Sequence, residues 1–187
     1  MMKTIETHNL HGREKLDHIL TYYKLPIFLG ILFIFLAGSL VRHLVTKKEI
    51  VLYVGIVNIA ASEELLTEIR RAFLADAYPG ERRTDIEILN ALYLKENPAP
   101  EETEYVRASE VKFLGSVTVG RMDAVITNES GLALLEQGGW IDTDTVTALK
   151  SSAFSAHGIT EDLYLALIGN TTRKETALQF QAVLNDE

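Results

Sequence analysis

The chain has 187 residues, no cysteine and a formal net charge of −8 at pH 7. The absence of cysteine excludes disulfides, thiolate nucleophiles and cysteine-based metal sites. The acidic balance argues against a nucleic-acid partner, which needs a basic patch. The basic pairs at 70–71, 82–83 and 173–174 are all close to acidic residues. We therefore expect a protein that binds no nucleic acid.

The first predicted element is an uncharged apolar run, Leu25–Val41, which Leu44 and Val45 can extend. A bilayer-spanning helix needs about 20 mostly apolar residues, and flanking Tyr, Arg and Lys residues suit its ends. The run predicts a transmembrane helix over 25–45, preceded by a tail over 1–24 and followed by a domain over 48–187. A cleaved signal peptide is the alternative, but the mixed-charge segment before the run favours an uncleaved anchor.

The charge distribution bears on orientation. Residues 1–45 carry five Lys/Arg and three Asp/Glu, whereas residues 46–187 carry thirteen and twenty-three. Basic residues near the two ends of the run slightly favour an N-terminus on the inner side. We therefore expect a single-pass protein of the cell membrane that contacts the lipid bilayer through residues 25–45, with an extracellular C-terminal domain.

The domain opens with a β-branched apolar run, Lys48–Ile59, which predicts a strand buried on both faces. An amphipathic helix over 61–77 follows, with Ser62 as its N-cap and Pro79-Gly80 after its end. The pattern of Thr84–Leu94 predicts the second strand. A turn-rich segment then leads into a helix over 102–119 that ends at Gly120.

The second half of the domain repeats this alternation. A short buried strand is expected over 123–127 and a short helix over 131–137. The stretch Trp140–Gly158 shows no clear periodicity, apart from a helical turn expected over 145–152. Leu163–Ile168 predicts a fourth strand, and a capping box at 172–175 opens a last amphipathic helix.

Alternating strands and helices favour parallel strands joined by crossovers. We therefore predict an α/β domain, a three-layer sandwich with a mostly parallel sheet of about four strands, preceded by one transmembrane helix.

Sequence motifs for catalysis or cofactor binding are absent. The chain has no glycine-rich nucleotide-binding motif, no nucleophile elbow and no metal-ligand spacing, so we expect no catalytic residue, cofactor or metal. Of the five histidines, His157 alone lies well inside the domain. Asp123, Glu129 and His157 are the acid–base groups that an enzyme would have available.

Ligands of open α/β sheets bind at the carboxyl ends of the strands. Polar residues follow three of the predicted strands there, and we select Asn58, Asn128, Glu129, Asn170 and Thr171 as candidate ligand or partner contacts. The alternative role of such residues is to cap helices and form turns. Trp140 could be a stacking platform or could cover the edge of the sheet.

Two segments, Gly115–Ile141 and Tyr164–Leu184, resemble bacterial extracellular solute-binding proteins. The first pairs a helix ending in glycine with a D-x-V-I strand, and the second reads roughly N-x-x-x-K-E-x-A-x-x-F. Ile50–Asn58 and Glu63–Phe73 fit the start of a lobe. The resemblance implies the fold of one lobe, whereas solute-binding proteins close two lobes over a ligand.

We therefore predict a membrane-anchored, non-enzymatic binding or accessory module. Its partner would be another membrane protein or a second copy of the chain that supplies the missing half of a cleft. The alternatives are a membrane-anchored enzyme and a scaffold whose domain faces the cytoplasm.

Overall fold

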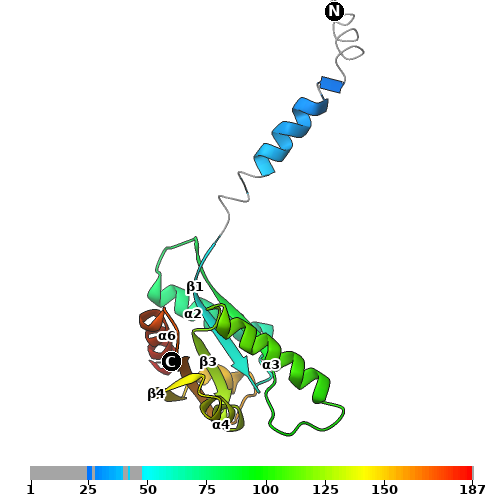
Figure 1. Ribbon diagram of the computed structural model, residues 1–187. Coiled ribbons are helices and arrows are strands. Elements are labelled where there is room, and N and C mark those ends of the chain that lie inside the picture. Colours follow the sequence, from blue (N-terminus) through cyan, green and yellow to red (C-terminus); the bar gives the residue numbers. More distant parts are fainter. Residues whose placement is uncertain (1–24, 27, 40–41, 43–47, 187) are drawn as a thin grey trace, which may run out of the picture. The chain divides into compact units, whose positions relative to one another are not determined.

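The computed structural model describes residues 25, 26, 28–39, 42 and 48–186 (Figure 1). The chain divides into two compact units, Met1–Lys47 and Lys48–Glu187. The tail expected over 1–24 lies outside the described residues.

The predicted transmembrane helix over 25–45 is not supported. The described helical residues of the first unit are 25, 26, 28–39 and 42. No helix in the described part of the chain is both long enough and apolar enough to cross a bilayer.

The second unit is an α/β domain built on a five-stranded mixed sheet. Its strands are β1 (Glu49–Val57), β2 (Thr84–Leu92), β3 (Ala124–Asn128), β4 (Ile141–Leu149) and β5 (Leu163–Ile168). They lie in the order β2-β1-β3-β5-β4. The pairs β1–β2 and β1–β3 are parallel, whereas β5 is antiparallel to both β3 and β4. The α/β class is as expected, but the four-stranded, mostly parallel sheet is wrong in strand number and in the direction of β5.

The missed strand is β4, which occupies part of the stretch without clear periodicity. Its sequence, IDTDTVTAL, is rich in polar residues, and most of it is half-buried or exposed. It lies at the edge of the sheet and has an irregularity in its pairing with β5 between Asp142 and Thr147. An edge strand has few neighbours to pack against, so its sequence carries little of the apolar pattern from which strands are predicted.

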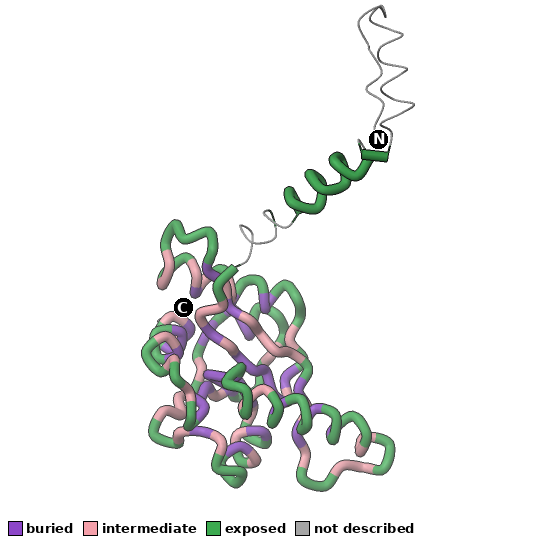
Figure 2. Tube along the Cα trace, turned by 45° about the horizontal axis from the view of Figure 1, so that its top comes forward, coloured by how far each residue is buried: buried purple, intermediate pink, exposed green. Residues whose placement is uncertain are grey.

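Helices cover both faces of the sheet. They are α2 (Glu63–Ala77), α3 (Thr103–Thr118), α4 (Glu129–Gln137), α5 (Ser152–Ala156) and α6 (Lys174–Asp186). One core joins the sheet to α2, α5 and α6, and the other joins it to α3 and α4. Figure 1 shows α2 and α6 close together, with α3 apart from them, and Figure 2 shows the buried residues gathered in the interior of the domain.

The topological switch point of the sheet lies between β1 and β3. After β1 the chain continues into α2 on one face, and after β3 it continues into α4 on the other face. Two parallel neighbours whose following helices lie on opposite faces leave a crevice at their carboxyl ends, which is where ligands of open α/β sheets bind. The polar residues at this edge are therefore the first place to look for a site.

Candidate functional site at the carboxyl ends of β1 and β3

Asn58 follows β1 and connects it to the segment after β2. Its backbone is in the left-handed region, with φ of 58°, a conformation that asparagine tolerates better than most residues. Its Oδ1 accepts a hydrogen bond from the Leu94 N–H at 2.8 Å, and its Nδ2 donates to the Leu94 carbonyl at 2.9 Å. The side chain thus pairs with the Leu94 backbone as a neighbouring strand would.

Asn128 ends β3 and caps α4. Its Oδ1 accepts hydrogen bonds from the Gly131 N–H at 3.1 Å and from the Ser130 hydroxyl at 2.9 Å. Its Nδ2 donates to the backbone carbonyl of Asn58 at 3.3 Å and to Glu161 Oε2 at 3.0 Å. Asn128 therefore joins β1, α4 and the loop before β5 at one point.

The first turn of α4 packs closely onto β3 because residue 131 is glycine. A Cβ at Gly131 would overlap the Thr127 hydroxyl and would lie 3.3 Å from Nδ2 of Asn58. Thr127 is fully buried, and its Oγ1 has no hydrogen-bond partner within the described structure. Close packing of the helix start onto the strand fixes the position of the whole asparagine network.

A groove opens beside this network. It has a volume of about 470 Å³ and lies between α4 and the segment Tyr93–Glu96, with Asn58, Asn128 and Ser130 also in its lining. A second hollow of about 200 Å³ shares Leu94, Lys95, Glu96, Leu134 and Gln137 with it and extends to Trp140. The combined groove falls within the size range of small-molecule sites.

Two aromatic residues of the groove are braced by other rings. The Trp140 ring is 5.3 Å from that of Phe113, centroid to centroid, and the Tyr93 ring is 6.1 Å from that of Tyr105. Trp140 is half-buried and follows α4. The Trp140 ring packs against the core and also lines the groove.

The charged residues of the groove are mostly acidic. Glu96 and Glu110 line it together with one cation, Lys95. Lys95 Nζ lies 2.6 Å from Glu102 Oε2. Hydrogen bonding to Glu102 raises the pKa of Lys95, and the hydrogen bonds from Lys95 and then from the Ala99 N–H lower the pKa of Glu102. The lysine charge is therefore already matched by a carboxylate.

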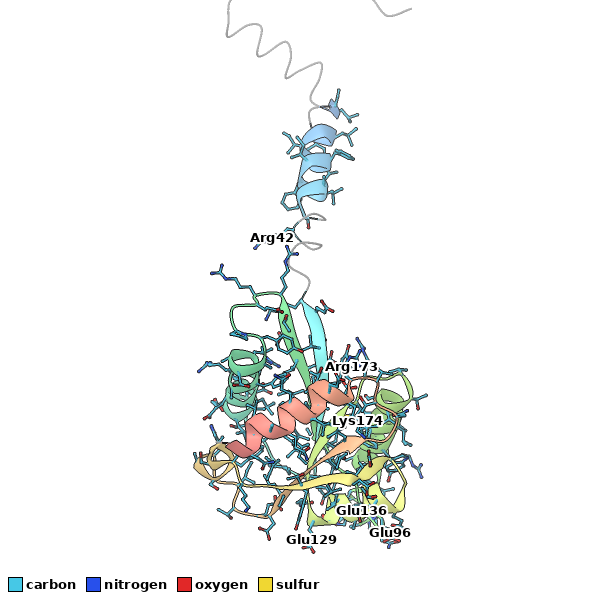
Figure 3. All side chains as sticks on the ribbon, turned by 90° about the vertical axis from the view of Figure 1, so that its left-hand side faces the viewer. Arg42, Glu96, Glu129, Glu136, Arg173 and Lys174 are labelled. Carbon is cyan, nitrogen blue, oxygen red and sulfur yellow. The ribbon has the colours of Figure 1, made fainter. Side chains whose placement is uncertain are left out.

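The edge around the groove carries further carboxylates. Glu129, the first residue of α4, is exposed, and Glu161 bonds to Asn128. Figure 3 shows the labelled side chains of Glu96, Glu129 and Glu136 at the same lower edge of the domain, away from Arg173 and Lys174.

Asn170 and Thr171 lie at the opposite ends of the strands, where β3 begins. The structure therefore separates them from the other three candidates. Both follow β5, whose direction is opposite to that of β3. The Thr171 hydroxyl donates to Asp123 Oδ1 at 2.6 Å, just before β3 begins. The prediction placed these residues beside Asn58 and Asn128 because it assumed that β5 is parallel.

Asp123, one of the three acid–base candidates, is buried and bonded to groups that hold the fold together. It is 1% exposed, and its Oδ2 accepts a hydrogen bond from the Tyr53 N–H at 2.9 Å. Arg173 lies 3.4 Å from its Oδ1, and the Arg173 guanidinium lies 5.0 Å from the centroid of the Tyr53 ring. This carboxylate ties together β1, β3 and the start of the last helix, and it lies outside the groove lining.

His157 takes part in an array that the sequence did not reveal. Its Nε2 lies 2.9 Å from Glu68 Oε2, and its Nδ1 lies 3.4 Å from the Ser62 hydroxyl oxygen. Ser62 caps α2 by accepting a hydrogen bond from the Leu65 N–H at 3.3 Å. Hydrogen bonds from its own N–H and then from Ser62 lower the pKa of Glu64. The hydroxyl is therefore shared between a helix cap and a carboxylate.

Several groove residues were absent from the sequence prediction. Tyr93, Lys95 and Glu96 follow β2, so the expected parallel β1–β2 pair would have placed them at this edge. Glu161 precedes β5 and required knowledge that β5 runs backwards. Trp140 was recognised as a possible platform, but nothing in its sequence context connected it to the groove.

The described residues contain no group of three or more His, Asp or Glu side chains arranged to hold a metal ion. Comparison with family models, with curated proteins and with solved structures finds no match to the chain. The resemblance to solute-binding proteins stays a prediction.

Proposed function

We propose that the domain is a non-enzymatic binding module, comparable to one lobe of a solute-binding protein, and that the groove at the carboxyl ends of β1 and β3 is its ligand-binding surface. One observation carries the proposal. An open groove of about 470 Å³, lined by a few polar groups and by Tyr93, continues into a hollow of about 200 Å³ that reaches Trp140. It lies at the carboxyl ends of β1 and β3, whose following helices cover opposite faces of the sheet.

An open groove covers only part of a ligand. The resemblance to one lobe supports a second wall supplied by another copy of the chain or by a partner protein. Binding to the isolated chain should therefore be weak, and the groove should bind more tightly when the second wall is present.

The test is a small-molecule screen of the full chain by amide chemical-shift mapping, with neutral, anionic and cationic members. The expected result is a set of ligands whose shifts concentrate on the segment 93–96, on the start of α4 and on the Trp140 indole. Ala133 is exposed and lines the groove, so Ala133→Phe should block binding without changing the core.

The matched control is Ala75→Phe, which places the same ring on an exposed position of α2. This variant should bind as the parent chain does. The proposal fails when no member of any charge shifts the groove resonances, or when both phenylalanine variants bind equally well.

The competing function is hydrolysis, and the Ser62–His157–Glu68 array is the observation in its favour. A hydroxyl, an imidazole and a carboxylate in this order can activate a nucleophile. The surroundings oppose it, because three carboxylates line this hollow against the one arginine, Arg71, and would repel the oxyanion of a tetrahedral intermediate; they are those of Glu63, Glu64 and Glu68. We expect a fluorophosphonate probe to leave Ser62 unlabelled, and covalent labelling that requires His157 would establish an enzyme instead.

A further inference from the structure

We infer that the ligand of the groove is a small organic cation, bearing an ammonium or guanidinium group; this inference rests on the proposed function and names the class of its ligand.

The lining of the two hollows carries more carboxylates than cations. Lys95 is the one cation among the lining residues of both hollows, and Glu102 accepts its hydrogen bond at 2.6 Å. Glu96 and Glu110 line the groove and form no ion pair with any described residue, and Glu161 is held beside the groove by Asn128. A bound cation would gain attraction from carboxylates on more than one side.

Aromatic rings also line the two hollows. A cation within about 6 Å of a ring centroid is attracted by the ring, and tryptophan gives the strongest attraction. Trp140 lines the same hollow as Glu96 and Glu110. Phe113 and Tyr105 brace Trp140 and Tyr93, so the rings lose little freedom when a ligand binds. Rings together with carboxylates form a site suited to an ammonium or guanidinium group.

An anionic ligand fits the groove less well than a cation does. The usual anion sites in such a crevice are a lysine and the N-terminus of the following helix. Here the lysine is paired with Glu102, and the start of α4 is capped by Asn128 and carries Glu129 in its first turn. An anionic ligand would compete with Glu102 for the lysine and would meet the Glu129 carboxylate at the helix start.

The experiment uses the fluorescence of Trp140, the single tryptophan of the chain, as a reporter inside the groove. The full chain is titrated with Nα-acetyl-arginine methyl ester (the arginine ester) and, in parallel, with Nα-acetyl-citrulline methyl ester (the citrulline ester), which has the same length but carries no charge. We expect saturable binding of the arginine ester, with the citrulline ester weaker by about five-fold or more. Succinate should give no saturable change.

Variants assign the effect to the groove. The double variant Glu96→Gln/Glu110→Gln should weaken binding of the arginine ester by about five-fold or more, because each exposed carboxylate contributes about two- to five-fold. Lys95→Met should strengthen it by a smaller factor, because it removes the opposing charge. The control is Glu49→Gln, which removes one carboxylate charge at the far end of β1 and should leave the affinity unchanged.

The outcomes separate this inference from the proposed function. Equal binding of the two esters, or unchanged binding in the Glu96/Glu110 double variant, overturns the cation while leaving a groove ligand of another class in place. If neutral or anionic molecules shift the groove resonances and the arginine ester does not, the cation is likewise overturned. If no molecule of any charge reaches the groove, both fail together.

Discussion

Replacing Asn58 with alanine should destabilise the domain more than its half-buried position suggests. The change removes two hydrogen bonds to the Leu94 backbone, at 2.8 and 2.9 Å. Each such bond contributes about 1 kcal/mol net. Alanine must also adopt the left-handed φ of 58°, which costs it roughly a further 1 kcal/mol. We therefore expect Asn58→Ala to lower the free energy of unfolding by about 2–4 kcal/mol.

Asn58→Gly separates the two contributions. Glycine loses the same hydrogen bonds but adopts the left-handed conformation without strain, so it should be about 1 kcal/mol more stable than alanine at this position. The assay is urea-induced unfolding of the full chain, followed by circular dichroism and by Trp140 fluorescence. Asn97→Ala, in the exposed segment after β2, is the control and should change stability by less than about 0.5 kcal/mol.

Two results would refute this reasoning. A loss below about 0.5 kcal/mol for Asn58→Ala would mean that the pairing with Leu94 contributes nothing to stability. Equal stability of the alanine and glycine variants would mean that the left-handed conformation carries no cost for alanine. The second result would leave the hydrogen bonds as the whole effect.

Three further predictions concern other contacts of the domain. Gly131→Ala should destabilise by about 1–3 kcal/mol, measured by urea unfolding, because its methyl group overlaps the Thr127 hydroxyl, and Thr127→Ala in the same chain should recover part of the loss. Asp123→Ala should cost about 3 kcal/mol with unchanged groove affinity, because a buried backbone N–H and a nearby guanidinium lose their carboxylate. Lys95→Met should raise the pKa of Glu102, measured by carboxyl NMR titration.

The pH dependence of Glu102 follows from the direction of its shift. Its pKa is lower in the folded chain than in the unfolded chain, so the unfolded chain binds the proton more readily on acidification. The stabilising contribution is present at neutral pH, above the ordinary glutamate pKa of about 4.3, and is lost as the pH falls through the folded value.

Each of these predictions has a result that contradicts it. A double Thr127→Ala/Gly131→Ala variant no more stable than Gly131→Ala alone would place the clash elsewhere. Loss of groove binding in a folded Asp123→Ala chain would connect the two edges of the sheet. A Glu102 titration that is the same with and without Lys95 would show that the ion pair does not form in solution.

The sequence was informative where a strand is surrounded by the core. Strands β1, β3 and β5 are largely buried on both faces, so each appears in the sequence as a continuous apolar run. Strand β4 has a polar, partly exposed sequence, and the turn expected over 145–152 proved to be mostly strand. Burial of an edge strand is set by its neighbours, which a single sequence does not specify.

The direction of each strand determines at which end of the sheet the candidate residues after it lie. No local signal distinguishes a final strand that returns antiparallel from one that crosses over, because both present an apolar run of similar length. Asn58 and Asn128 were placed correctly at one edge because their strands are parallel. Asn170 and Thr171 were misplaced by the single assumption about β5.

The asparagines that the sequence identified shape the groove and have little bonding capacity left for a ligand. Both side-chain polar atoms of Asn58 are used on Leu94, and those of Asn128 bond to Gly131, Ser130, the Asn58 carbonyl and Glu161. Because an amide has few donors and acceptors, a ligand must find its partners among the neighbouring side chains. Those neighbours include two aromatic rings and more carboxylates than cations, which is why we propose a cation as the ligand although the two asparagines are neutral.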